Sequence, residues 1–254
     1  MILRDKVILV TGAAGGLGRA FAQRFAAEGA SVVCADIKGA SETVRLIEEA
    51  GGKAIALSVD ITDAESVREM CDAAVSACGG IDGLVNNAAI YAGLSMKPFH
   101  EIDEDEWDRV MAVNAKGTWL CCKIVYPYLI RRGGGSIVNI ASASILEGNP
   151  FFAHYTASKG AVWALTRSVA RTAGEHGVRC NSITPGYTMT DASKGLAGSP
   201  EDFQKNYDYS IQARAIHRAM EAGDVVGGVL FLLSDDSAFI TGQNLNIDGG
   251  CIHY

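Results

Sequence analysis

The sequence predicts an α/β protein with a doubly wound parallel sheet, covered by helices on both faces, in a single domain. Short apolar runs rich in Val and Ile alternate with longer amphipathic stretches along all 254 residues. The apolar runs are continuous, as expected of strands buried on both faces. The alternation is typical of strand–helix–strand units, which build parallel sheets. No linker, low-complexity stretch or internal repeat divides the chain.

The limits of each element follow from where the apolar runs begin and where glycines end the amphipathic stretches. Gly29 and Gly51, for example, follow two of the expected helices. The expected strands cover residues 7–11, 31–36, 53–59, 81–86, 136–141, 178–184 and 244–247. The expected helices cover residues 16–28, 41–50, 64–78, 105–114, 117–131, 155–173 and 225–233.

One long segment, from Tyr187 to about Ala222, interrupts the alternation with polar and aromatic residues. A segment of this length inside a compact domain is usually functional. We therefore expect residues 187–222 to form a substrate lid within the single domain of residues 1–254.

Charge and composition exclude several classes of partner. The formal net charge is −7, whereas binding to nucleic acid or anionic membrane needs a basic face. No run approaches the ~18 uncharged apolar residues needed to span a bilayer, and the first residues do not form a targeting signal. The seven cysteines have irregular spacings that suit neither disulfides nor a metal site. We expect a cytoplasmic protein that acts on a small molecule, without a metal.

A glycine-rich turn, T-G-A-A-G-G-L-G at residues 11–18, lies between the first expected strand and the first expected helix. Glycine permits a tight turn and close backbone approach to a pyrophosphate, and the helix N-terminus offers unpaired N–H groups. Such a turn alone is a weak signal, but an acidic residue about 20 positions later strengthens it. We expect a dinucleotide to bind through Gly12, Gly16, Leu17 and Gly18.

That acidic residue is Asp36, at the end of the second expected strand. A carboxylate there accepts hydrogen bonds from the ribose hydroxyls of NAD and repels the additional phosphate of NADP. No Arg stands in the turn or directly after Asp36, although Lys38 leaves some use of NADP open. The expected cofactor is NAD, with Ile37 in the same site. The alternative interpretation of Asp36 is a solvated carboxylate at a strand end.

The ends of the third and fourth strands are expected to complete the cofactor site, because the carboxyl ends of parallel strands line the ligand crevice. Asp60 is placed to meet the adenine ring, with Ile61 beside it. Asn87 and Ala88 follow the fourth strand, where small residues let the backbone pass close to the cofactor.

Tyr155 and Lys159 form a candidate catalytic pair at the start of a long expected helix. Their spacing places them on one face, one turn apart. A nearby ammonium lowers the pKa of a phenol, which can then take or return a hydroxyl proton while hydride moves to or from a nicotinamide. Ser142 follows the fifth strand and is placed to hold the substrate oxygen. Asn114, at the end of an expected helix, is placed to hold a water that links Lys159 to solvent.

Taken together, these motifs resemble the short-chain dehydrogenase/reductase family over essentially the whole chain. The resemblance rests on T-G-x-x-x-G-x-G at 11–18, the acidic strand ends, N-N-A at 86–88, Y-x-x-x-K at 155–159, R-x-N-x-x-x-P-G at 179–186 and D-G-G at 248–250. It implies a Rossmann-type domain, a catalytic set of Asn114, Ser142, Tyr155 and Lys159, and a homotetramer. A weaker similarity, from the I-T-G-Q ending and Tyr91, is to bacterial NAD-dependent dehydrogenases of secondary alcohols.

The family resemblance also implies further contacts to the cofactor. Tyr155 and Lys159 would lie at the nicotinamide ribose, and Pro185, Gly186 and Thr188 would border the nicotinamide, with Thr188 touching its carboxamide. Ala89 departs from the glycine more usual in the family. We expect this departure to leave the chemistry unchanged.

Substrate selection is expected to come from the least regular parts of the chain. The candidates Tyr91, Ser144, Phe152 and Tyr187 suggest a partly apolar pocket for a ring or hydrophobic group. The alternative interpretation of each is packing against the scaffold or a neighbouring subunit. His154 is either a polar group of this pocket or an exposed histidine at a helix start.

Three functions remain open at this point. The first is an NAD-dependent dehydrogenase of a secondary alcohol. The second is an NADPH-dependent ketone reductase, such as a 3-oxoacyl carrier protein reductase, which should carry basic residues at the adenosine ribose. The third is a non-catalytic dinucleotide-sensing protein, in which the catalytic set should be damaged. The intact set Ser142, Tyr155 and Lys159 favours an enzyme.

Overall fold

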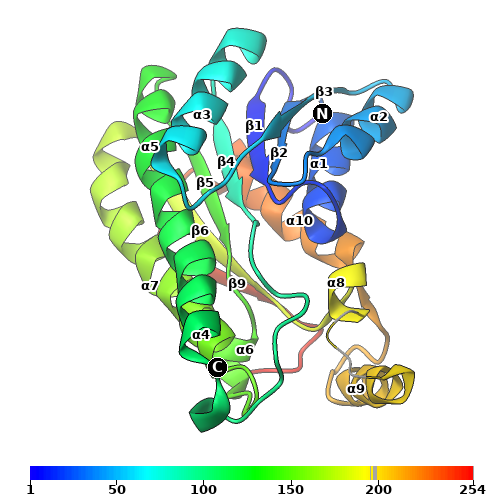
Figure 1. Cartoon of the computed structure of the whole chain (residues 1–254). Helices are drawn as coiled ribbons and strands as arrows, with labels where there is room; N and C mark the ends of the chain where they lie inside the picture. The colour runs from blue at the N-terminus through cyan, green and yellow to red at the C-terminus, as the bar shows by residue number, and fades with distance from the viewer. Residues whose placement is uncertain (195, 197–198, 254) are drawn as a thin grey trace.

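The computed structural model describes residues 1–194, 196 and 199–253, and within them seven strands form one sheet. The order is β3-β2-β1-β4-β5-β6-β9, and every neighbouring pair is parallel. The doubly wound parallel sheet is therefore confirmed (Figure 1). The strands are β1 (Val7–Thr11), β2 (Ser31–Asp36), β3 (Lys53–Ser58), β4 (Gly83–Asn86), β5 (Gly135–Ile140), β6 (Val178–Pro185) and β9 (Asn244–Ile247).

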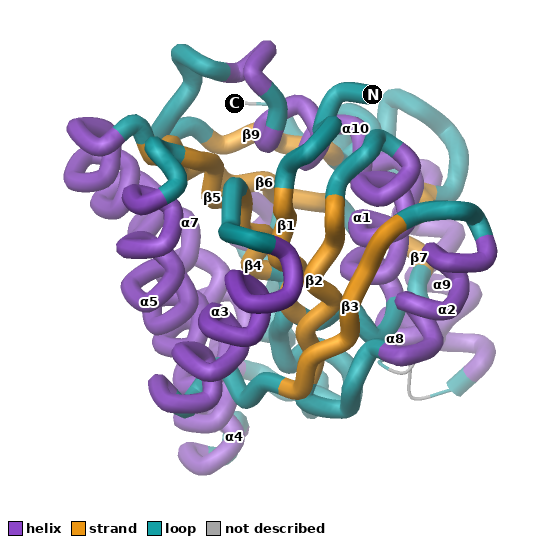
Figure 2. The backbone as a smooth tube through the Cα atoms, turned by 90° about the horizontal axis from the view of Figure 1, so that it is seen from above, coloured by secondary structure: helices purple, strands orange, loops and turns teal. Residues whose placement is uncertain are grey.

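Helices cover both faces of the sheet, which Figure 2 shows from above. One face carries α1 (Gly16–Ala27), α2 (Ser41–Glu49) and α10 (Ala222–Leu233). The other face carries α3 (Ala64–Cys78), α5 (Thr118–Arg131) and α7 (Ala153–Ala173), with α4 (Glu104–Val110) leading into α5. Short 3₁₀ turns lie at η1 (Phe99–Glu101), η3 (Gly174–His176) and η4 (Asp235–Ser237). None of the helices in the described part of the chain is long and apolar enough to cross a membrane.

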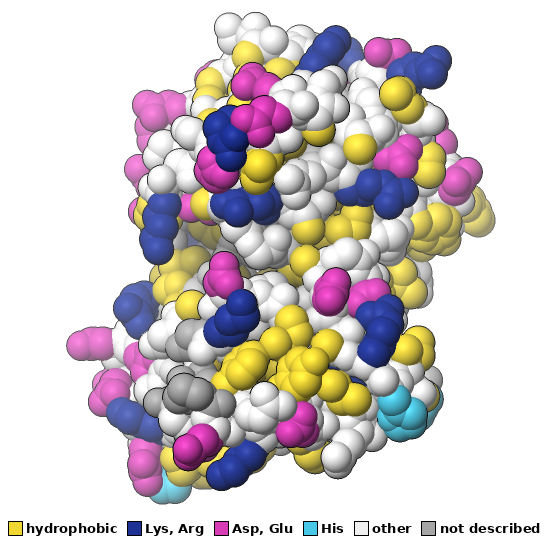
Figure 3. Space-filling view, turned by 90° about the vertical axis from the view of Figure 1, so that its right-hand side faces the viewer, with side chains coloured by type: hydrophobic (Ala, Val, Ile, Leu, Met, Phe, Trp, Pro, Cys, Tyr) yellow, Lys and Arg dark blue, Asp and Glu magenta, His cyan; other side chains and the backbone are white. Residues whose placement is uncertain are grey.

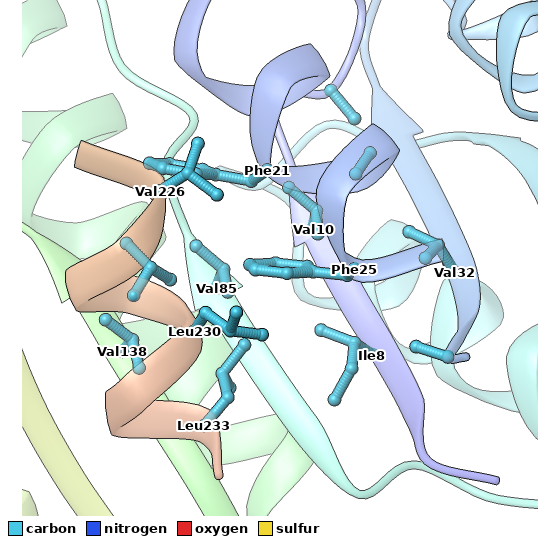
Figure 4. Packing of buried hydrophobic residues seen from close by; sticks show 14 of the residues in the cluster. Ile8, Val10, Phe21, Phe25, Val32, Val85, Val138, Val226, Leu230 and Leu233 are labelled. Atoms are coloured by element: carbon cyan, nitrogen blue, oxygen red, sulfur yellow. The ribbon is translucent and has the colours of Figure 1, made fainter. Parts of the chain in front are cut away.

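The hydrophobic core between α1, α10 and the sheet holds the first turn of α1 in place. Phe21 and Phe25 stack with their ring centroids 6.1 Å apart, and they pack against Val10, Val226 and Leu230 (Figure 4). Burying each such side chain contributes about 1.5–3 kcal/mol. Because α1 is held this firmly, its first turn keeps a defined position at the end of β1.

The helices expected at 105–114 and 117–131 are one continuous helix, which corrects the sequence prediction. A π-helical turn, η2 (Met111–Gly117), joins α4 to α5. Gly117 does not end a helix here. A Cβ at this position would lie 2.8 Å from the side chain of Ile61, so glycine permits the helix to approach the loop after β3.

Residues 187–222 contain regular structure that the sequence analysis did not predict. They form β7 (Thr188–Met189), α8 (Asp191–Lys194), α9 (Pro200–Gln212) and β8 (Met220–Glu221), and β7 pairs with β8. Arg214 donates hydrogen bonds to the carbonyls of Tyr187 and Arg218, which ties the two ends of the segment together. Figure 3 views this side of the molecule and shows hydrophobic side chains gathered in the lower half of this face.

Phe25 provides a test of the core. Replacing this fully buried ring by Ala should lower the free energy of unfolding by about 3–5 kcal/mol, because transfer energy is lost and a cavity remains. Urea denaturation followed by circular dichroism measures this change. Phe239→Ala is the matched control, since Phe239 is fully exposed, and it should change stability by less than about 0.5 kcal/mol. Equal losses in both variants would contradict the assignment of this core.

Candidate active site

The carboxyl ends of the strands meet at the lower edge of the sheet in Figure 1, between α8 and α9 on one side and α4 and α6 (Ser144–Glu147) on the other. The glycine-rich turn lies at this edge. Gly12 has φ +67°, and a Cβ on it would lie 2.8 Å from the Cα of Ala88. A Cβ on Gly18 would lie 2.1 Å from the carbonyl oxygen of Gly12. Both glycines are required by close backbone approach.

The N-terminus of α1 suits a phosphate. Gly15 is its N-cap residue, and no described side chain caps the helix or places an acidic group in its first turn. A Cβ on Gly15 would have no neighbour within 4 Å, so the first turn faces open space. Unpaired N–H groups and the positive end of the helix dipole favour an anion there. The residues therefore fit the pyrophosphate of a dinucleotide.

Asp36 lies beside the same turn. Its carboxylate accepts hydrogen bonds from the backbone N–H of Ala14, at 3.1 Å, and of Lys38, at 2.9 Å. The acidic residue expected at the ribose is thus fixed next to the phosphate-binding turn. Ile37, also expected in the cofactor site, is 64% exposed at this edge.

The residues after β3 and β4 serve mainly to hold the edge together. Asp60 accepts hydrogen bonds from the backbone and hydroxyl of Thr62, and Ile61 is buried in the core. Asn87 donates to the carbonyls of Thr11 and Gly12, both at 3.0 Å. Contacts of Asp60, Ile61, Asn87, Ala88, Gly16 and Leu17 with a cofactor stay a prediction.

Tyr155, Lys159 and Ser142 lie together at the ends of β5 and α7. The Lys159 Nζ lies 5.8 Å from the centre of the Tyr155 ring and donates a 2.7 Å hydrogen bond to the carbonyl of Ile140. The Ser142 hydroxyl lies close enough to the Tyr155 phenol to lower its pKa. Tyr155 and Lys159 are both buried, 9% and 4% exposed.

Burial governs the protonation of this pair. It raises the pKa of Tyr155 to about 12, against the opposing effect of the Ser142 hydrogen bond. It also lowers the pKa of Lys159 to about 8. The sequence analysis expected the neighbouring ammonium to dominate and to lower the pKa of Tyr155. In the protein alone desolvation is larger, because it disfavours the charged form of both groups.

Asn114 was expected at the end of a helix. It lies instead inside the π-helical turn η2, where it is fully buried. Its side chain accepts a hydrogen bond from the backbone N–H of Ile90 at 2.7 Å. It donates to the carbonyl of Ile90 and to the hydroxyl of Ser158, both at 3.1 Å. π-Helical turns are frequent at functional sites. Ser158, which sequence reasoning missed, therefore links Asn114 to the helix of Tyr155.

The end of β6 borders the same edge. The N–H of Gly186 bonds the carbonyl of Ile247, and a Cβ on Gly186 would lie 2.9 Å from Asp248. The hydroxyl of Thr188 donates to the carbonyl of Gly186 at 2.9 Å. Pro185, Gly186 and Thr188 are thus adjacent to the sheet edge, and their contacts to a nicotinamide stay a prediction.

Two of the substrate candidates, Tyr91 and Phe152, lie beside Tyr155. The Tyr91 and Phe152 rings have centroids 5.1 and 6.3 Å from that of Tyr155. Burial raises the pKa of Tyr91, and the phenols of Tyr155 and Tyr187 raise it further. Leu94 and three neighbours that the sequence did not indicate, Ile90, Val110 and Leu196, complete the apolar wall. Ser144 begins α6, and its buried hydroxyl has no hydrogen-bond partner among the described residues.

This sheet, with a glycine-rich turn, an adjacent carboxylate and a Tyr–Lys pair at one edge, is typical of an oxidoreductase that uses a nicotinamide dinucleotide. A family model described as "Enoyl-(Acyl carrier protein) reductase" matches residues 12–252. The chain belongs to the short-chain dehydrogenase/reductase family.

Individual relatives agree with this assignment. An uncharacterized oxidoreductase of Mycobacterium tuberculosis is 43% identical over 250 residues, which cover 98% of each chain. Meso-2,3-butanediol dehydrogenase of Serratia marcescens is 38% identical over 248 residues, 97% of this chain and 94% of that protein. The crystal structure of levodione reductase superposes with a TM-score of 0.91 at 32% identity over 97% of each chain.

The buried cation of Lys159 should reduce stability at neutral pH. Its pKa falls from 10.5 to about 8, which costs about 3 kcal/mol at ~1.4 kcal/mol per pKa unit. Because its folded pKa is depressed, this cost is present in full below pH 8 and disappears as the pH rises towards 10.5. Lys159→Met also loses the bond to Ile140, worth about 1 kcal/mol, so we expect it to be about 2 kcal/mol more stable than the native chain at pH 7.

Urea denaturation at pH 7 and at pH 10 measures this difference, which should shrink at the higher pH. Lys53→Met, at an exposed lysine on the edge strand β3, is the control and should show no such pH dependence. A Lys159→Met protein that is less stable than the native chain at pH 7 would contradict the cost of burial.

Proposed function

We propose that this protein oxidises a secondary alcohol with NAD, or reduces the matching ketone with NADH, using Tyr155 as the general acid–base. The observation that carries the proposal is the convergence of the Ser142 hydroxyl, the Tyr155 phenol and the Lys159 ammonium at the edge that holds the glycine-rich turn. Two relatives, a butanediol dehydrogenase and a levodione reductase, support the same class of substrate.

A nicotinamide held at this edge would supply the two-electron acceptor for the hydride that the carbinol carbon loses when the alcohol becomes a ketone. Ser142 holds the substrate oxygen and fixes its distance from Tyr155. Tyr155 takes the hydroxyl proton during oxidation and returns it during reduction. Asn114 is proposed to hold a water that connects Lys159 to solvent.

The pKa shifts of Tyr155 and Lys159 indicate what Lys159 contributes to the reaction. A phenol with a pKa of about 12 is a proton donor at neutral pH and suits the reducing direction. Oxidation needs the phenolate, which the cation of Lys159 stabilises. With a pKa of about 8, Lys159 remains largely charged at pH 7.

We propose NAD because Asp36 presents its carboxylate beside the phosphate-binding turn. Ionised, it accepts from ribose hydroxyls and repels a 2′-phosphate. The alcohol is proposed to lie against the aromatic wall of Tyr91 and Phe152, which suits a ring or a hydrophobic substituent. Residues 187–222 are the proposed lid, with Tyr187 at its base, and the enzyme is proposed to act as a cytoplasmic homotetramer.

Tyr155→Phe tests the proposed acid–base. Removing the hydroxyl should lower kcat by about 10²–10⁴-fold, the usual contribution of general acid–base catalysis. NADH binding, followed by fluorescence titration, should change little. A screen of NAD reduction over secondary alcohols, polyols, hydroxysteroids and hydroxy acids supplies the substrate. Full activity in the variant would exclude Tyr155 as the base.

Asp36→Ala tests the choice of cofactor. Loss of a charged hydrogen-bond acceptor should weaken NADH binding by about 10–100-fold, while NADPH binding should improve because a repulsive charge is removed. Asp72→Ala is the control, since the Asp72 carboxylate accepts a hydrogen bond from the hydroxyl of Tyr128 in α5, and the NADH/NADPH preference should persist. Tighter NADPH than NADH binding by the native chain would favour the ketone reductase instead.

A further inference from the structure

The segment from Ile90 to Ser95 carries the substrate-facing side of the aromatic wall, and two side chains hold its ends. Asn114 bonds both the N–H and the carbonyl of Ile90. Glu106, in α4, accepts from the N–H of Ser95 at 2.9 Å and from the Ser95 hydroxyl. Between these anchors, Tyr91 and Leu94 pack against Tyr155.

Each anchor also faces the catalytic helix α7. Asn114 donates to the hydroxyl of Ser158, and the Glu106 Oε1 lies 3.6 Å from the Nε2 of His154. His154 and Ser158 are four residues apart, hence one turn apart on one face of α7, and Tyr155 lies between them in sequence. Asn114 and Glu106 therefore each connect the 90–95 segment to the same helix, α7.

His154 is the unusual member of this arrangement. Its side chain is fully buried, which corrects the alternative of an exposed histidine at a helix start. Neither ring nitrogen has a hydrogen-bond partner among the described residues. A buried polar ring is unfavourable without a partner, and a small movement would bring its Nε2–H within hydrogen-bond distance of Glu106.

The charges around Glu106 favour this bond. Burial raises the pKa of Glu106, but the hydrogen bonds from Ser95 and the proximity of His154 outweigh it, so the net shift is downward. Lys97, the nearby cation, pairs with Asp103 at 2.9 Å. Glu106 therefore remains an ionised acceptor between Ser95 and His154.

We propose that His154 is a positioning residue that, through Glu106, holds the 90–95 segment and its Tyr91 against Tyr155. The inference rests on the proposed function for its kinetic consequence, but the tie itself is testable without turnover. In this role His154 touches neither substrate nor cofactor. It affects catalysis only by fixing the position of Tyr91 in the aromatic wall.

The test compares His154→Gln, whose amide nitrogen can reach the position of Nε2, with His154→Leu, which keeps the volume but has no donor. In the full chain with NADH bound, hydrogen exchange of the Ser95 amide should be unchanged in the Gln variant and about tenfold faster in the Leu variant, as for loss of one charged hydrogen bond. His176→Leu, at an exposed histidine, is the control and should leave Ser95 unaffected.

Kinetics with the best alcohol from the screen give the second readout. The Leu variant should raise KM for the alcohol about tenfold with kcat and NADH binding nearly unchanged, and the Gln variant should restore KM. Equal effects of Gln and Leu, or no effect of Leu on either readout, would overturn the proposal. If no alcohol is turned over by the native chain, the proposed function fails, and the exchange rates still decide whether the tie exists.

Should His154→Leu not fold, Glu106→Ala tests the same tie from the other side. It should accelerate exchange of the Ser95 amide and raise KM with little change in kcat. An unchanged Ser95 exchange rate and KM in that variant would overturn the proposal.

Discussion

The arrangement of this site depends on a positive charge that the fold buries. Lys159 is 4% exposed and has the carbonyl of Ile140 as its hydrogen-bond acceptor. That carbonyl is available because β5 ends there, so the end of a strand in the middle of the sheet supplies the contact that an ammonium needs in the interior. Tyr155 and Ser142 take their positions from the same two elements, α7 and β5. The lowered pKa of Lys159 indicates that burial disfavours its charged form.

Polar side chains then join the strand ends into one surface. Asn87 connects the end of β4 to the carbonyls at the end of β1, and Asn114 connects the loop after β4 to α7. Hydrogen bonds of this kind contribute about 1 kcal/mol each, which is modest beside the burial of Phe21 and Phe25. These hydrogen bonds matter mainly for geometry, because they fix the orientation of backbone and side-chain groups at the edge of the sheet.

The sequence was sufficient for the sheet, most helix limits and the Tyr155–Lys159 pair, because those follow from periodicity, glycine positions and spacing. It was insufficient at Asn114, since a π-helical turn has no simple sequence pattern and the residues around it suit an ordinary helix. It was also insufficient for the protonation of Tyr155, which depends on burial by residues distant in sequence. The helix α9 was overlooked even though Ser199, Pro200 and Glu201 are a recognisable helix start.

Residues 187–222 are attached to the rest of the protein at their two ends. This attachment bears on how substrate selectivity relates to the catalytic groups. β7 and β8 pair at the base of the segment, Arg214 grips the carbonyl of Tyr187, and the backbone of Ile216 bonds that of Gly249. Both ends of residues 187–222 are thereby held at the C-terminal border of the sheet. If these residues act as the proposed lid, changes in length or sequence between the two ends would alter which molecules are admitted without disturbing the glycine-rich turn or the buried lysine. Substrate selectivity could then diverge while the groups that carry the chemistry stay the same.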